Sequence, residues 1–115
     1  MLAGIVTNGS TGAGAALIED PSRAKEIIRA LKRGAGNDMP VSVKTRIGYF
    51  QNQISGWLPE LLEEDLAALT VHLRTMKEMS DVPAHWDLAG DVLELGRKHA
   101  PQTKILGNGD IRSLA

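Results

Sequence analysis

The sequence contains no cysteine. Disulfide bonds, thiolate metal sites and a cysteine nucleophile are therefore excluded within these 115 residues. Phenylalanine and tyrosine occur once each, so the core must be built from Leu, Ile, Val and Ala side chains. What remains has the composition of an ordinary globular protein, with 43% hydrophobic and 23% charged residues. Its length suffices for one domain, residues 1–115, and is too short for two.

Long apolar runs are missing as well. No stretch approaches the ~20 residues that are needed to span a bilayer. The first ten residues, MLAGIVTNGS, have neither a charged n-region nor a sustained apolar region, so no signal peptide is evident. We therefore expect no membrane contact and a cytoplasmic location.

Neither sign of charge is in large excess. Thirteen basic and 14 acidic residues leave a net charge of −1, which gives no global electrostatic argument for binding nucleic acid. A local patch remains possible, and one predicted helix carries a basic cluster of Lys25, Arg29, Lys32 and Arg33. We interpret this cluster as a solvated helix face.

Helical and strand patterns alternate along the chain. Asp20 and Pro21 are an N-cap and a first helical residue, and Ala24, Ile27 and Ile28 begin an apolar stripe. The patterns predict helices over residues 21–33, 52–64 and 85–99, strands over residues 40–46, 67–73 and 104–107, and the start of a further helix in NGDIRSLA. Within the second helix, Pro59 predicts either a kink or a start near Trp57.

This alternation predicts an α/β fold with parallel strands. Two architectures fit, a flavodoxin-like sheet and a partial (β/α)8 TIM barrel of about three to four βα units. A complete barrel needs ~250 residues, so the chain would supply only an arc with two open edges. Such an arc would require further segments or a partner chain to complete the barrel.

Polar side chains gather at the carboxyl ends of the three predicted strands. Side chains alternate along a strand, so each strand presents its polar residues on one face. These residues are Ser42, Lys44 and Arg46 on the first strand, Thr70, His72 and Arg74 on the second, and Asn108 followed by Asp110 on the third. Ligands bind beyond the carboxyl ends of parallel strands, so the three ends together predict a binding site.

Two glycine-containing stretches are candidates for binding phosphate. GNGDI, opening a helix, would offer backbone N–H groups to an anion. GAGAAL lacks the GK[ST] of a P-loop and follows no clear strand, so we interpret it as a tight loop-to-helix turn. No metal site is predicted.

Four stretches in this order and spacing resemble the tRNA-dihydrouridine synthase family: GAGAALIEDP, VSVKTRIGY, LTVHLRTMKEM…AHWD and ILGNGDI. The resemblance covers nearly the whole chain. It implies a TIM barrel that binds FMN, followed by a small helical domain that helps to hold tRNA, and it favours the barrel over the flavodoxin-like sheet.

The resemblance also implies roles for individual residues. Lys44 would contact the flavin ring and stabilise negative charge on reduced FMN, and His72 would be a second FMN contact. Arg46 and Arg74 would face the uracil or the tRNA. Asn108, Gly109 and Asp110 would lie near the flavin ribityl chain and phosphate. NADPH would be the reductant, C6 of a tRNA uridine would receive the hydride, and a cysteine would protonate C5.

The chain departs from the family pattern at several points. The family's catalytic cysteine belongs to an NxGCP segment shortly before GAGAAL, and this chain has no cysteine, so no catalytic residue is assigned to it. Leu73 replaces the glycine of the HGRT motif. We expect a central fragment of the barrel, without its N-terminal strands, its last strand and the helical domain, and therefore weakly active or inactive alone. The alternatives are a non-catalytic α/β module for phosphate or RNA, and another FMN-dependent oxidoreductase barrel such as a dihydroorotate dehydrogenase relative.

Overall fold

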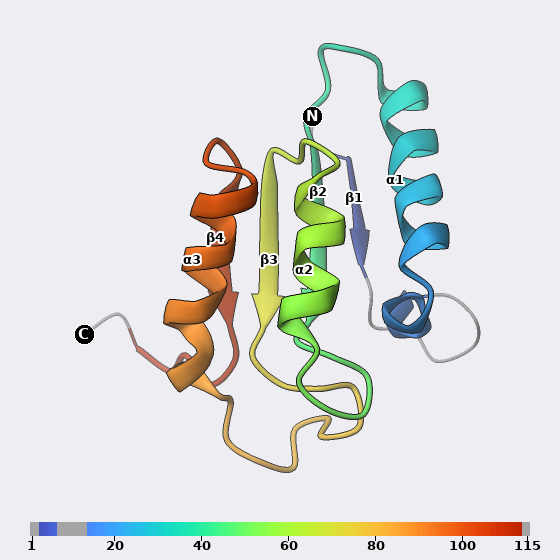
Figure 1. The fold of residues 1–115 in the computed structure, drawn as a ribbon. Coiled ribbons are helices and arrows are strands. Elements are labelled where there is room, and N and C mark those ends of the chain that lie inside the picture. Colours follow the sequence, from blue (N-terminus) through green and yellow to red (C-terminus); the bar gives the residue numbers. More distant parts are fainter. Residues whose placement is uncertain (1–2, 7–13, 114–115) are drawn as a thin grey trace.

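The computed structural model describes residues 3–6 and 14–113. Its strands are β1 (Ala3–Val6), β2 (Val41–Arg46), β3 (Ala68–His72) and β4 (Lys104–Asn108). Its α-helices are α1 (Pro21–Ala35), α2 (Ile54–Leu62) and α3 (Ala89–His99), and short 3-10 helices at Gly14–Glu19 and Trp86–Leu88 precede α1 and α3. The four strands are all parallel and lie in the order β1-β2-β3-β4 (Figure 1).

The three α-helices lie on one face of the sheet (Figure 1). Leu69 and Val71 of β3 point into this layer and have no exposed surface, while Thr70 and His72 alternate toward the other face. The predicted α/β fold with parallel strands is confirmed. A flavodoxin-like sheet reverses its strand order and carries helices on both faces, so the sequential order seen here does not match it.

The first helix begins as the sequence predicts. Asp20 caps α1 by accepting a hydrogen bond from the Arg23 backbone N–H, and Pro21 is the first helical residue. Ala24 and Ile28 are buried in the core. Ile27, predicted to belong to the same stripe, is 37% exposed, because the face that α1 turns toward the sheet is narrower than the apolar pattern.

The second helix continues through its proline. Pro59 lies inside α2, which begins at Ile54, so the predicted start near Trp57 is not observed. The carbonyl that loses its intrahelical partner belongs to Ser55, an exposed residue that water reaches. The apolar side chains predicted on one face are all buried: Ile54, Trp57, Leu58, Leu61 and Leu62. Their burial stabilises the helix against the cost of the proline.

The basic cluster of α1 contributes to an interhelical ion-pair network, which its interpretation as a solvated face did not include. Lys25 Nζ lies 3.0 Å from a carboxylate oxygen of Glu60 on α2. Arg29 donates from Nε (2.7 Å) and from Nη2 (3.0 Å) to the two oxygens of Glu64, which is itself buried. Partners 35 residues apart in sequence are invisible to a helical periodicity.

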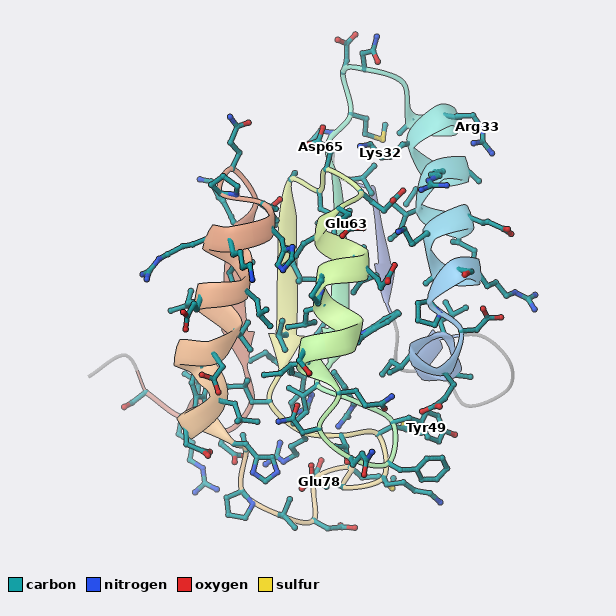
Figure 2. The ribbon with its side chains drawn as sticks, viewed as in Figure 1. Lys32, Arg33, Tyr49, Glu63, Asp65 and Glu78 are labelled. Carbon is teal, nitrogen blue, oxygen red and sulfur yellow. The ribbon has the colours of Figure 1, made fainter. Side chains whose placement is uncertain are left out.

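The end of α1 is tied to the chain after α2. Lys32 donates hydrogen bonds to the backbone carbonyls of Glu64 and Asp65, at 2.8 and 3.0 Å. Figure 2 shows Lys32, Arg33 and Asp65 at the end of the molecule where β2 and β3 begin. Arg29 and Arg33 are exposed, as predicted for a solvated face, whereas Lys25 and Lys32 are half-buried.

Three further sequence predictions need correction. β1 precedes the GAGAAL stretch, although no strand was evident there; residues 12–13 of that stretch lie outside the described residues. The helix predicted from residue 85 starts with a 3-10 turn and becomes α-helical only at Ala89. NGDIRSLA does not open a helix within the described residues, because β4 extends to Asn108 and residues 111–113 have no regular structure. In the part of the chain that the structure describes, no helix is long and apolar enough to cross a membrane.

Candidate functional site

A row of polar residues crosses three neighbouring strands at their C-terminal ends. Arg46 ends β2, His72 ends β3 and Asn108 ends β4. The sheet register pairs Arg46 with His72 and His72 with Asn108. Because adjacent strands lie about 4.8 Å apart, the three side chains form one continuous row on the face that no helix covers. The polar residues at the three strand ends therefore lie side by side in the structure.

Lys44 lies one step deeper in the sheet, on the same face. It pairs with Thr70, which pairs with Leu106 of β4. Lys44 is half-buried, and Leu106 is 48% exposed although it is a large apolar side chain. Lys44 is diagonal to His72 rather than directly opposite it, so a ligand must extend along the strands to meet both.

His72 is held as a neutral hydrogen-bonding group. Its Nε2 lies 3.0 Å from Nη1 of Arg74, and because a guanidinium only donates, Nε2 must accept and the proton of the neutral ring resides on Nδ1. Burial, together with the positive charges of Arg46, Arg74 and Lys44, lowers the pKa of His72 to about 4. Both observations give the same protonation state, with Nδ1–H as the donor.

Arg74 is buried and its donors are used inside the chain. Its Nε donates to the Val82 carbonyl at 2.7 Å, and its Nη2 donates to Asp110 at 2.5 Å. Only 7% of its side-chain surface is exposed. The direct contact with uracil or tRNA expected for Arg74 does not fit this burial. Arg74 instead orients His72 and joins β3 to the turn after β4.

The turn after β4 is shaped by Gly109 and Asp110. Both adopt positive φ, 121° and 59° respectively, and a Cβ on Gly109 would lie 3.2 Å from the His72 ring. The Asp110 carboxylate accepts from Arg74 and from the Ala84 backbone N–H, and these hydrogen bonds lower its pKa. The turn is therefore stabilised by a carboxylate bound to a buried cation, and no helix N-terminus contributes.

Arg46 connects the row to the loop after β3. Its Nη1 donates to the carbonyls of Thr75 and Met79, at 3.1 and 3.2 Å. Its Nε is buried without a hydrogen-bond partner, the only such side-chain atom among the described residues. A buried donor without a partner costs free energy, so Arg46 is held in this position against a local penalty.

No separate role was predicted from the sequence for the loop after β3, which packs around the row. Glu78 accepts from the Thr75 backbone N–H at 2.7 Å and contacts Nε2 of His85 at 2.6 Å. Trp86 donates from Nε1 to the Gly109 carbonyl at 2.7 Å and so supports the turn after β4. The AHW run was the sequence signal for this loop, but only the fold shows that the Trp86 side chain reaches Gly109.

The charges at this edge favour an anion or an electron-accepting ring. Lys44, Arg46 and Arg74 gather around His72, with Asp110 as the balancing carboxylate. No group of three or more His, Asp or Glu residues suited to a metal ion occurs in the described residues. A separate hollow of about 420 Å³ between α2 and α3, lined by Asn52, Ser55, Asp91 and Lys98 among others, lies on the helical face away from this row.

Comparison with known proteins decides the family. The sequence model of the dihydrouridine synthase family (Dus) matches residues 5–115. The chain belongs to the dihydrouridine synthase family. In this family member, the VKTR stretch forms the end of β2, and the VHLRT stretch spans the end of β3 and the three residues beyond it. The motifs that carried the resemblance are therefore adjacent in space.

Curated relatives of this dihydrouridine synthase family member come from several bacteria. A probable tRNA-dihydrouridine synthase of Staphylococcus aureus (strain Mu50) and one of Staphylococcus epidermidis (strain ATCC 12228) are each 48% identical over 101 residues. A probable tRNA-dihydrouridine synthase 2 of Bacillus subtilis (strain 168) is 46% identical over the same length. In each case the match covers 87% of this chain and 30% of the relative.

The donors of the row suit a flavin in chemical terms. A flavin has carbonyl oxygens and ring nitrogens that accept hydrogen bonds and acquires negative charge on reduction. Lys44, Arg46 and Nδ1 of His72 all donate, and two of the three are cationic.

Proposed function

We propose that this chain supplies the flavin-binding side of an FMN-dependent enzyme that reduces uridine to 5,6-dihydrouridine in tRNA. The observation that carries the proposal is the register of Arg46, His72 and Asn108 across three strands, with Lys44 one step below. Family membership and relatives named as probable tRNA-dihydrouridine synthases support the substrate class. The chain spans about 30% of the length of those relatives, so it holds only part of the machinery.

The proposed architecture is an arc of a (β/α)8 barrel. Four sequential parallel strands with their helices on one face form such an arc, and the uncovered face would be the barrel interior. The exposure of Leu106 on this face supports the proposal, since a large apolar side chain there would be buried on closure. Residues 1–115 would form one continuous part of this domain, and further barrel segments or a partner chain would close it.

Each residue of the row has a proposed task. Lys44 would bind the flavin ring and stabilise negative charge on its reduced form. His72 would donate from Nδ1 to an acceptor of the flavin, held in that orientation by Arg74. Asn108, Gly109 and Asp110 would lie along the ribityl chain and phosphate. Arg46 would face the uracil.

The overall reaction requires a hydride and a proton. FMN, when bound and reduced by NADPH, supplies the hydride for C6 of uridine. A proton must reach C5, and the family's cysteine acid for that step has no counterpart here, because the sequence contains no cysteine. We expect the chain alone to show little or no uridine reduction and to purify without stoichiometric flavin.

A flavin titration tests the proposal. FMN added to the purified chain should lose fluorescence on binding, weakly because the site is incomplete. Lys44→Ala should weaken this binding by roughly tenfold or more, the loss expected for a charge-assisted contact of about 1.5–3 kcal/mol. Lys98→Ala, which removes an exposed lysine of α3, is the matched control and should bind as the unaltered chain does. Equal affinity of the Lys44→Ala and unaltered chains would remove the assigned role.

A non-catalytic module that binds phosphate or RNA loses its main support. Its best feature was the basic cluster of α1, and Lys25, Arg29 and Lys32 bind carboxylates or carbonyls within the chain. The third alternative, another FMN-dependent oxidoreductase barrel, is less consistent with the family match than a dihydrouridine synthase.

A further inference from the structure

Two loops at the carboxyl edge of the sheet present an exposed aromatic ring. Phe50 is 63% exposed, more than any other large apolar side chain among the described residues. The Tyr49 ring meets it edge-on, with centroids 4.7 Å apart and an interplanar angle of 64°. Lys77 Nζ lies 5.4 Å from the centroid of the Phe50 ring. We call these three residues the aromatic platform.

The platform is held in place by the backbone of both loops. Lys77 donates its backbone N–H to the Tyr49 carbonyl, and Met76 donates to the Gly48 carbonyl, each at 3.0 Å. Tyr49 donates its backbone N–H to the Gln53 side chain at 2.8 Å. Gly48 is required, because a Cβ there would lie 1.8 Å from a backbone carbonyl oxygen. The exposed Phe50 ring therefore belongs to a constrained loop.

The platform is continuous with the candidate site. The loop that carries Tyr49 and Phe50 follows directly after Arg46 at the end of β2. Arg46 in turn donates to the Thr75 and Met79 carbonyls, on either side of Lys77. Figure 2 shows Tyr49 and Glu78 among the loops at the carboxyl end of the strands, opposite to Lys32 and Asp65. The platform and the row therefore share the carboxyl end of the sheet.

A flat apolar ring beside a cation has a defined ligand chemistry. Unpaired nucleobases stack on aromatic side chains, and a nearby lysine attracts the phosphate of the same or the next nucleotide. The remaining exposed surface of the Phe50 ring is open to solvent. Constraint of the loop reduces the entropy that binding would otherwise cost.

We propose that the aromatic platform stacks an unpaired base of the tRNA that carries the target uridine. This rests on the proposed function, because it assumes that tRNA approaches the row. Phe50 stacks the base, Tyr49 supports the ring from its edge, and Lys77 contacts a phosphate. The platform is thus a positioning surface for RNA and takes no part in the reduction.

The test is the affinity of the full 115-residue chain for an unmodified tRNA transcript, measured by fluorescence anisotropy. Phe50→Ala should weaken binding by roughly tenfold, the size of one base–aromatic stack, while Phe50→Trp should retain or strengthen it. Lys77→Ala should reduce the salt dependence of binding by about one phosphate contact. Leu93→Ala and Lys98→Ala remove an exposed apolar and an exposed basic residue of α3 and serve as matched controls.

Each outcome decides a different claim. A specific loss with Phe50→Ala, rescued by Phe50→Trp, supports the platform. Equal tRNA affinity of the Phe50→Ala and unaltered chains overturns the platform. So does full displacement of tRNA by heparin, a polyanion without bases, if Phe50→Ala does not change that displacement. Either result leaves the proposed function standing. Absence of tRNA binding by the unaltered chain overturns the platform, whereas the FMN titration with Lys44→Ala decides the flavin site independently.

Discussion

At the scale of single residues, Arg74 determines the geometry of the site. It binds His72, the Val82 carbonyl and Asp110, and so joins the end of β3, the following loop and the turn after β4. An exposed arginine at a strand end would contact ligands, whereas this one is buried and acts through its neighbours. The property that matters is the direction of its donors, which only an arginine fork supplies in this arrangement.

Replacement of Arg74 should therefore affect both stability and the protonation of His72. Arg74→Gln should lower the free energy of unfolding by about 1–3 kcal/mol, because it leaves partners of a buried donor unsatisfied. It should also raise the pKa of His72 by removing a nearby cation. Urea denaturation measures the change in stability, and NMR titration of the His72 ring measures the change in its pKa. Arg97→Gln, at an exposed position of α3, is the control and should change stability by less than about 0.5 kcal/mol.

His72 also predicts a dependence of stability on pH. Its folded pKa of about 4 lies below the ordinary value of 6.5, so the folded chain binds fewer protons than the unfolded chain between these values. Stability should therefore fall as the pH decreases from about 6.5 to about 4. His72→Asn should remove this part of the dependence. Titration of the His72 ring near pH 6.5 in the folded chain would contradict the assignment.

For single residues, the sequence predicted which face of the sheet a side chain occupies better than it predicted what that side chain contacts. Lys44, His72 and Asn108 share the uncovered face because strand alternation is a local property. The burial of Arg74 was not predictable, since its partners Val82 and Asp110 lie on segments that only the fold brings together.

At the scale of elements, β2 and α2 are joined by a buried side-chain hydrogen bond. Trp57 Nε1 donates to the Thr45 hydroxyl at 2.9 Å, and both residues are nearly inaccessible to solvent. The bond fixes α2 against the strand that carries Lys44 and Arg46. The position of the row therefore depends in part on the helix layer behind it.

Thr45→Val should test this link. Valine keeps the shape of threonine but leaves the indole N–H of Trp57 buried without an acceptor, at a cost of about 1–3 kcal/mol. Trp57→Phe in the same chain should cost less in the Thr45→Val background than alone, since the two residues share one hydrogen bond. The coupling energy between the two residues follows from the unfolding free energies of the unaltered chain, the two single variants and the double variant. Strict additivity of the two single effects would show that the hydrogen bond contributes nothing.

Element boundaries followed from local signals where those signals were strong. Asp20 and Pro21 fixed the start of α1, whereas the sequence predicted a helix after Asn108 from a glycine and an aspartate. The Asp110 carboxylate instead accepts hydrogen bonds from Arg74 and from the Ala84 backbone N–H, so it caps no helix in the described residues. A capping residue with a distant partner cannot be recognised from its neighbours in sequence.

At the scale of the whole molecule, one sheet face is covered and the other carries the site. All three α-helices pack on one side, and the strand order is sequential (Figure 1). Sequence periodicity could predict parallel strands but not the strand order, which depends on tertiary packing. The proposed barrel interior, with Lys44, His72 and Leu106 facing it, needs the remaining strands of the barrel to exclude water.

The central claim is that this chain supplies the flavin-binding side of a tRNA-dihydrouridine synthase and lacks the proton donor. The most direct test replaces the matching segment of the Staphylococcus aureus relative with this chain and measures dihydrouridine in an unmodified tRNA by mass spectrometry, with FMN and NADPH present. We expect the chimera to form dihydrouridine, with the remaining segments of the relative supplying the proton donor. Lys44→Ala within the chimera should abolish most of that activity, and the isolated chain should form little or none. A folded chimera that binds FMN and tRNA normally yet keeps full activity with Lys44→Ala would contradict the account.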